Sequence, residues 1–327
     1  MEMENQSAGP HPDFKALSAA VTRIREEIAR VVVGQHEMVD LIIAAMLADG
    51  HVLIEGVPGV AKTLTAKLAA RCLDVGFSRI QFTPDLMPSD LVGTSVFNPQ
   101  TVQFVFRPGP LFSQVVLIDE INRSPAKTQA ALFEAMEEKQ VTVDGKTHVM
   151  EEPFMVIATE NPVEHEGTYR LPEAQLDRFL FRIRVPYPSL EEEIRILEYA
   201  HQGNTARFAA IVHPVIGAAE LLRFRALVET LHIEAPVTEY IVRLVRATRE
   251  DPAVYLGASP RASVAVLRAA RAVAAIAGRD FVTPDDVNRV LAPVVCHRIT
   301  LTPEKEMEGV TAEQVVEGLV KKTEVPR

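Results

Sequence analysis

The 327-residue chain carries a net charge of −10 and contains 47% hydrophobic and 24% charged residues. This is the balance of an ordinary globular protein, and the length allows two domains, each with its own core. The negative charge gives no overall attraction to nucleic acid or anionic lipid, although a local basic groove stays compatible with it. Only two cysteines occur, far apart and without metal-ligand spacing, so we expect buried thiols in a reducing compartment.

The N-terminal segment lacks the basic and apolar regions of a signal peptide. Residues 1–12 are polar with proline and glycine, and we expect them to be disordered. The longest apolar run, at residues 41–48, is too short to span a bilayer. These features predict a cytoplasmic protein without a membrane span.

Apolar residues recur at helical spacing from about Phe14 to Val33, and a second helix follows that ends at Gly50. Short apolar runs then alternate with helical stretches, which predicts the α/β class with a parallel sheet covered by helices. Five strands are expected, at 51–55, 79–82, 115–120, 154–159 and 180–185.

Two stretches depart from this alternation of strands and helices. Residues 94–106 have strand-forming halves around Asn98-Pro99, and residues 141–149 turn at Asp144-Gly145, a strong hairpin signal. Neither stretch is needed to complete a sheet. We therefore expect two hairpins inserted into the α/β domain.

The C-terminal part has a different pattern, because no strand run of the same quality follows residues 185–193. Proline directly after a capping residue marks helix starts at Pro260 and Pro284. The sequence thus predicts an α/β core over residues 1–187 and a small all-helical domain over residues 188–327. The helices of this second part are expected near 189–201, 218–231, 237–250, 260–277 and 284–298.

The stretch GVPGVAKT, residues 56–63, joins a buried strand to an amphipathic helix, the setting that a phosphate-binding loop requires. Its backbone N–H groups would surround phosphates, Lys62 would reach the β- and γ-phosphates, and Thr63 would ligate Mg²⁺. The usual pattern has glycine where this chain has Ala61, and alanine is compatible if its φ is negative. The alternative is a simple turn with a solvated lysine. The expected nucleotide-binding residues are Gly56, Val57, Pro58, Gly59, Val60, Ala61, Lys62, Thr63 and Leu64.

Two further strands end in polar residues. VVLIDE ends in Asp119 and Glu120, and ligands of open α/β sheets gather at the carboxyl ends of strands. Asp119 would support Mg²⁺ together with Thr63, and Glu120 would polarise water. Asn161 follows the next strand, where its amide could position the attacking water. The alternatives are a solvated strand end and an asparagine that caps a turn.

Arginines at element ends are the remaining candidates. Arg261 lies in the first turn of a helix, where a cation opposes the helix dipole, so an anionic partner explains it better than helix stability does. Arg178 precedes the fifth strand and could instead pair with Glu173 or Asp177 at the surface. Arg123 lies just before a predicted helix, and the start of that helix does not depend on this arginine.

The order of these motifs resembles that of the AAA+ ATPases, and GVPGVAKT, LIDEINR and LPEAQLDRF together resemble the MoxR family. The resemblance covers nearly the whole chain from about Phe14. It implies a sheet of order 5-1-4-3-2 followed by a helical lid, with ATP bound between them. Lys62 and Thr63 then belong to the Walker A motif, and Asp119 and Glu120 to Walker B.

The same resemblance assigns the other candidates. Asn161 matches sensor 1, Arg261 matches sensor 2, and Arg178 matches the arginine finger offered to a neighbouring subunit, with Arg123 as the alternative. The two hairpins match the helix-2 insert and the pre-sensor-1 insert. The turn VVGQ falls where related ATPases contact adenine, which adds Val33, Gly34 and Gln35 to the expected nucleotide-binding residues.

The resemblance also implies a function. MoxR-like proteins form hexameric rings and act as chaperone-like remodelling ATPases, often with proteins that carry von Willebrand factor A domains. We therefore expect an ATP hydrolase that assists assembly, maturation or cofactor insertion of client complexes. A nucleotide switch with little turnover and a nucleic-acid-dependent motor are the alternatives. Glu120 and Asn161 disfavour the switch, and the hairpin VTVDGKTHV lacks the basic cluster of a motor.

Overall fold

The computed structural model describes residues 12–161, 169, 171–201 and 211–326. The chain divides into two compact units. The larger comprises Ile24–Leu222, and the smaller comprises the residues up to Arg23 together with Arg223–Arg327. The segment predicted to be disordered lies outside the described residues except for Pro12, and the domain boundary predicted after residue 187 stays a prediction.

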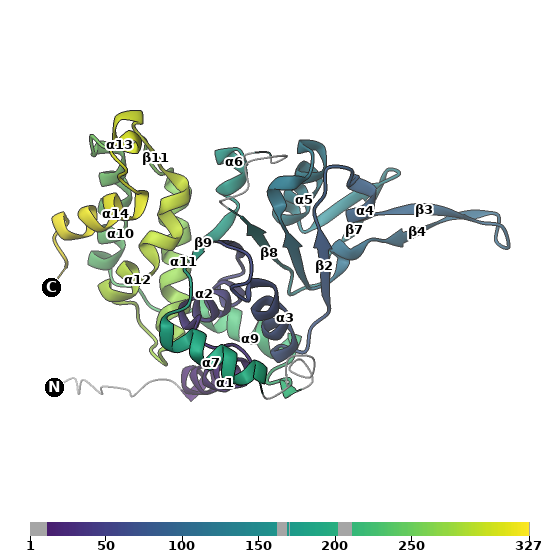
Figure 1. Ribbon diagram of the computed structural model, residues 1–327, viewed down its shortest axis with the longest axis horizontal. Helices are drawn as coiled ribbons and strands as arrows, with labels where there is room; N and C mark the ends of the chain where they lie inside the picture. Colours follow the sequence, from purple (N-terminus) through teal and green to yellow (C-terminus); the bar gives the residue numbers. More distant parts are fainter. Residues whose placement is uncertain (1–11, 162–168, 170, 202–210, 327) are drawn as a thin grey trace, which may run out of the picture. The chain divides into compact units, whose positions relative to one another are not determined.

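The larger unit is built on a parallel five-stranded sheet of order β2-β5-β8-β1-β9 (Figure 1). When these strands are numbered along the chain, the order reads 2-3-4-1-5, so the predicted order is confirmed. The strands are β1 (His51–Gly56), β2 (Phe77–Gln81), β5 (Val115–Asp119), β8 (Met155–Glu160) and β9 (Phe179–Val185).

Helices cover both faces of this sheet. On one face, α2 (His36–Leu47) contacts β1 and β9, and α3 (Lys62–Cys72) contacts β5 and β2. On the other face, the apolar side chains of α5 (Ala126–Glu138) join those of β1, β5 and β8 in a buried core. The central strands read as continuous apolar runs because both of their faces are covered.

Both predicted hairpins are confirmed. They are the antiparallel pairs β3 (Gly93–Asn98) with β4 (Gln103–Pro108), and β6 (Gln140–Val143) with β7 (Lys146–Val149). The β3–β4 hairpin projects away from the sheet (Figure 1). The ring of Phe106 on β4 stacks on His148 of β7 with the ring centroids 3.9 Å apart, so the two hairpins contact each other.

The five helices predicted in the C-terminal part are present. They are α7 (Leu190–His201), α9 (Ala218–Glu229), α10 (Ala235–Glu250), α11 (Pro260–Ile276) and α12 (Pro284–Val295).

The helix α14 was not predicted, although Thr311 and Gln314 form a capping box at its start. The elements outside these predictions are α4 (Pro88–Val92), η1 (Pro110–Phe112), η2 (Ile121–Arg123), α6 (Glu173–Leu176), β10 (Val254–Leu256), η3 (Cys296–Arg298), β11 (Thr300–Leu301), α13 (Pro303–Met307) and α14 (Ala312–Lys322). The chain's first helix, α1, spans Pro12–Ala29.

Both cysteines are buried free thiols, as expected, and burial raises the pKa of Cys72 to about 12. In the part of the chain that the structure describes, no helix combines the length and apolarity needed to cross a membrane.

Candidate nucleotide site

The loop between β1 and α3 has two glycines with different tasks. A Cβ at Gly56 would lie 2.9 Å from the carbonyl oxygen of Val185, so glycine lets the end of β1 pack against β9. Gly59 has φ 88°, and no other described atom lies within 4 Å of its Cβ position. The backbone at Gly59 therefore borders open space, as a phosphate cradle requires.

The condition that Ala61 has a negative φ is not met. Ala61 has φ 61° and ψ 18°, the left-handed conformation, immediately before the first residue of α3. The loop needs this conformation to turn into the helix, which explains why glycine is usual at this position. A non-glycine residue there costs about 1 kcal/mol, so the loop is strained.

Lys62 joins the loop to the neighbouring strand end. Its ammonium donates to the carbonyl oxygens of Gly56 and of Glu160, the latter at 3.4 Å. Burial lowers the pKa of Lys62, and nearby carboxylates, with Asp119 first among them, offset only part of this shift. A half-buried cation whose charge is not fully compensated is suited to bind a phosphate.

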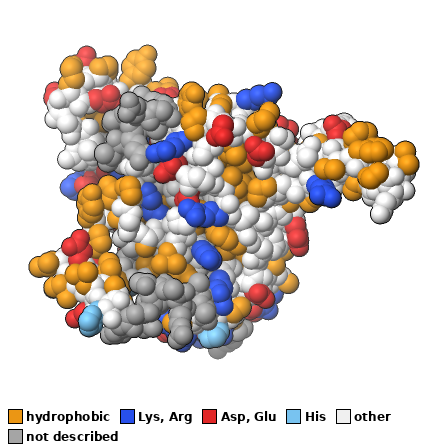
Figure 2. Space-filling view, turned by 45° about the vertical axis from the view of Figure 1, so that its right-hand side comes forward, with side chains coloured by type: hydrophobic (Ala, Val, Ile, Leu, Met, Phe, Trp, Pro, Cys, Tyr) orange, Lys and Arg blue, Asp and Glu red, His pale blue; other side chains and the backbone are white. Residues whose placement is uncertain are grey.

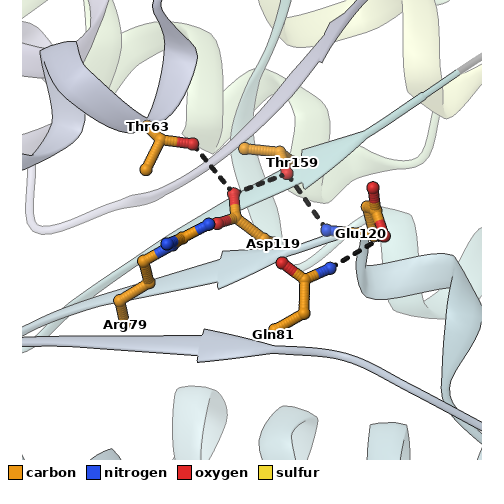
Figure 3. Close-up of polar contacts among 6 residues, drawn as sticks. All are labelled: Thr63, Arg79, Gln81, Asp119, Glu120 and Thr159. Atoms are coloured by element: carbon orange, nitrogen blue, oxygen red, sulfur yellow. Dashed lines mark hydrogen bonds and ion pairs between the residues drawn. The ribbon is translucent and has the colours of Figure 1, made fainter. Parts of the chain in front are cut away.

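Asp119 ends β5 with its carboxylate buried on the side of the sheet that faces α3. Its Oδ1 accepts hydrogen bonds from the hydroxyls of Thr63 and Thr159, each at 3.2 Å (Figure 3). Its Oδ2 lies 2.6 Å from the Nε of Arg79 on β2. The predicted neighbourhood of Thr63 and Asp119 is thus present, and these oxygens are ligands that Mg²⁺ accepts.

Glu120 also has a left-handed backbone, with φ 58° and ψ 54°. Its N–H donates to Thr159 Oγ1 at 3.1 Å, which fixes the turn that follows β5. Its carboxylate accepts a hydrogen bond from Gln81 Nε2 at 2.7 Å and lies 3.0 Å from Arg123 Nε (Figure 3 shows the former). Strained backbone that carries a reactive side chain is typical of functional sites.

Asn161 follows β8 directly and is 7% exposed. Since β8 lies between β5 and β1 in the sheet, Asn161 follows a strand end next to those of Glu120 and the phosphate loop. Arg261 lies in the smaller unit, at the exposed start of α11. Its approach to the phosphates stays a prediction.

Arg178 has a partner that the sequence did not suggest. Its Nη1 donates to Glu137 Oε2 at 2.5 Å and to the carbonyl oxygen of Phe133 at 3.0 Å, both on α5. Among the described residues, Arg178 thus pairs with α5 and not with Glu173 or Asp177, the alternative partners that the sequence offered. The partners on α5 are distant from Arg178 in the chain, and the fold brings α5 to the start of β9.

The turn VVGQ has two consecutive left-handed residues, Gly34 with φ 70° and Gln35 with φ 57°. The positive φ of Gly34 favours glycine, and a Cβ there would also displace the movable carboxylate of Glu192. A pocket of about 240 Å³ adjoins this turn, and among the three predicted adenine contacts it is lined by Gly34 but not by Val33 or Gln35. Its lining residues are Arg25, Ile28, Ala29, Val32, Gly34, His36, Val39 and Asp40.

Three residues of this site were missed from the sequence. Arg79 and Gln81 lie two positions apart on β2 and therefore point to the same side, where each contacts one carboxylate at the end of β5. Thr159 bonds to both residues of that strand end. The order of the sheet places β2 and β8 on either side of β5, so polar residues near the ends of those strands were the available signal.

Comparison with known proteins agrees with this geometry. Residues 51–181 match the family described as the ATPase family associated with various cellular activities (AAA), and residues 246–319 match the AAA lid domain. The chain is 42% identical to chaperone MoxR1 of Mycobacterium tuberculosis, over 92% of this chain and 81% of that protein. The chain belongs to the MoxR family of AAA+ ATPases.

Other relatives place this MoxR-family ATPase among proteins of similar length. It is 46% identical to the protein YeaC of Bacillus subtilis, over 92% of this chain and 93% of that one. A crystal structure of a candidate ATPase from Cytophaga hutchinsonii is 38% identical and superposes with a TM-score of 0.89, covering 97% of this chain and 98% of that one. The MoxR-family protein is thus an ATPase of a nucleotide-binding family whose members are typically oligomeric.

Proposed function

We propose that ATP is bound and hydrolysed where the phosphate loop meets the ends of β5 and β8. The observation that carries this proposal is the 3.2 Å hydrogen bond from Thr63 to Asp119, which brings the two expected Mg²⁺ ligands together. Lys62 and the backbone around Gly59 bind the phosphates of ATP. Glu120 polarises the attacking water.

Thr63 and Asp119 are the residues that would hold Mg²⁺, and the bound ion neutralises charge on the β- and γ-phosphates. The fit is supported by the donor set, a hydroxyl and a carboxylate. Asn161 positions water from the adjacent strand end, and Val33, Gly34 and Gln35 lie beside adenine.

The active form is a hexameric ring in which each site takes Arg178 from the next protomer, while Arg261 approaches from the lid. Arg178 can change partner because its ion pair with Glu137 is partly open to solvent, the two side chains being 31% and 44% exposed. Arg123 lies 3.0 Å from Glu120 of its own protomer and is the alternative for the arginine given to the neighbour.

In this proposal, the ATPase acts as a cytoplasmic remodelling chaperone in the assembly, maturation or cofactor insertion of client complexes, with a partner that carries a von Willebrand factor A domain. The β3–β4 hairpin supports a protein client, because its tip is apolar and exposed (Figure 2). Val102, Phe104 and Phe97 are 73%, 71% and 48% exposed. Exposed apolar patches mark surfaces that bind proteins.

Mixing two inactive variants tests the shared site. Glu120→Gln removes the residue that polarises water, and Arg178→Ala removes the arginine given to the neighbour. A ring of both variants contains some sites with an intact Glu120 and an intact Arg178, about one in four in a random equal mixture. Phosphate release should therefore rise above that of either variant alone.

Two controls make this experiment decisive. Mixing Glu120→Gln with Lys62→Ala must give no recovery, because both residues act within one protomer. If Arg178→Ala alone hydrolyses ATP at the wild-type rate in assembled rings, the arginine assignment is wrong. If wild-type rings bind ATP but release no phosphate, the protein is a nucleotide switch instead.

A further inference from the structure

Among the described partners of Asp119, Arg79 is the one that lies mainly in solvent. Its side chain is 55% exposed, whereas that of Asp119 is 8% exposed. The guanidinium covers Oδ2 at 2.6 Å, and the two threonine hydroxyls use Oδ1. Both oxygens of the carboxylate are therefore engaged in this structure.

Oδ2 accepts a hydrogen bond from Arg79, so a metal ion or its bound water at this oxygen would lie beside the guanidinium, and the repulsion between the two cations favours the departure of one partner of Asp119. Thr159 is 3% exposed and is also fixed by the N–H of Glu120, so it cannot withdraw. Thr63 is itself an expected ligand and stays with the ion. Arg79 is the partner that can move, because a long, half-exposed side chain reaches other positions without disturbing the core.

The position of Arg79 on the sheet supports this exchange. Arg79 aligns with Leu117 and Gln81 aligns with Asp119 in the parallel register of β2 and β5. The guanidinium thus reaches Asp119 from two residues before the strand ends. A swing toward the carboxyl ends of the strands would bring its charge toward the phosphates that Lys62 binds, where an arginine is favoured.

We propose that Arg79 is a positioning residue that neutralises Asp119 until Mg²⁺ and nucleotide arrive and then moves its charge to the nucleotide phosphates. This inference rests on the proposed ATP site. Arg79 and Mg²⁺ compete for one carboxylate oxygen, so Arg79 sets the Mg²⁺ concentration that nucleotide binding requires. Without Mg²⁺, Arg79 stays on Asp119 and cancels a negative charge that would repel ATP.

Equilibrium binding of ATP to the full chain tests this role in a Glu120→Gln background, where hydrolysis does not interfere. Removal of Arg79 by Arg79→Ala should lower the Mg²⁺ concentration for half-maximal ATP binding by about fivefold. The same variant should weaken ATP binding in EDTA by a similar factor, because the site loses a cation. Arg79→Lys, which keeps the charge, should give values between those of the parent protein and those of Arg79→Ala.

In this role, loss of Arg79 lowers the Mg²⁺ requirement for ATP binding but weakens ATP binding in EDTA. A purely structural role would not produce these two opposite effects. If Arg79→Ala weakens ATP binding equally with and without Mg²⁺, or changes neither, the proposal is overturned. Arg243→Ala is the matched control, because Arg243 forms an exposed ion pair with Glu239 on α10. Lys62→Ala tests the site itself: if it binds ATP as tightly as the parent protein, the proposed ATP site fails, whatever Arg79 does.

Discussion

Each compact unit contains a buried aspartate bound by arginine, and the two pairs differ in what surrounds them. In the smaller unit, Asp286 is 4% exposed, and its carboxylate accepts hydrogen bonds from both Nη atoms of Arg279, at 2.5 and 2.7 Å. The N–H and the hydroxyl of Thr283 add two bonds of 2.8 Å that close the capping box of α12. This pair is complete within its own unit.

In the larger unit, Asp119 is bound through a single nitrogen of Arg79 at the open end of the sheet. Its other contacts are hydroxyls, one of them from the phosphate loop. The same two residue types therefore stabilise a helix start in one unit and, by our proposal, form an exchangeable part of a nucleotide site in the other. A bidentate pair fixed by further backbone bonds is structural, whereas a single contact beside an open loop is free to exchange.

The largest difference should come from the two aspartates themselves. Asp119→Asn removes the charge that supports Mg²⁺ and should slow phosphate release by about a thousandfold. The melting temperature should change little, because the amide still accepts hydrogen bonds from the two threonines. Steady-state phosphate release and thermal unfolding measure the two effects. A variant that unfolds as easily as it loses activity would show that Asp119 has a structural task.

The corresponding change in the smaller unit should act on stability. Asp286→Asn leaves Arg279 without its counter-ion and weakens the cap of α12, which should cost about 2 kcal/mol. Urea unfolding measures this loss. Glu239→Gln, which removes an exposed partner of Arg243, should change the free energy of unfolding by less than about 0.5 kcal/mol. Equal losses of stability in Asp286→Asn and Glu239→Gln would contradict the structural role of the Arg279–Asp286 pair.

The strained loop gives a third and smaller effect. Ala61→Gly removes the penalty of a left-handed alanine but adds backbone freedom to the unfolded chain, so the net gain should be about 1 kcal/mol at most. ATP binding should be retained, because the methyl group has no task in the proposed site. A loss of stability would mean that the loop adopts a different conformation in solution.

The smallest effect should be a dependence on acidic pH. Burial alone would raise the pKa of Asp286, but the bonds from Arg279 and Thr283 outweigh it and hold the pKa below the usual 3.8. The pair thus contributes its full stability above that value and loses it as the pH falls through the lowered pKa. As the pH falls from about 5 to about 3, wild-type protein should therefore lose more stability than Asp286→Asn.

Much of the fold could be predicted because it depends on local patterns. Continuous apolar runs gave the strands, and Asp144-Gly145 gave the turn of the second hairpin. Helix α14 was missed because its apolar stripe is short, although Thr311 and Gln314 carried a cap signal. The strand order came from the family resemblance, since no local pattern contains it.

The candidate site was predictable where a motif carries it and not where the sheet assembles it. Lys62, Thr63 and Asp119 come together as expected. The left-handed φ of Ala61 could not be inferred, because a side chain that fits a position does not reveal the backbone angle there. Arg79 was missed because its contact depends on two strands that are far apart in the chain.

We propose that one site binds ATP through the phosphate loop and hydrolyses it at the carboxyl end of β5. ATP binding and phosphate release by Glu120→Gln, measured in assembled protein beside Lys62→Ala, test it most directly. We expect Glu120→Gln to bind ATP with wild-type affinity and to release phosphate at least about a hundredfold more slowly, whereas Lys62→Ala should lose ATP binding. Phosphate release by Glu120→Gln at the wild-type rate would contradict it.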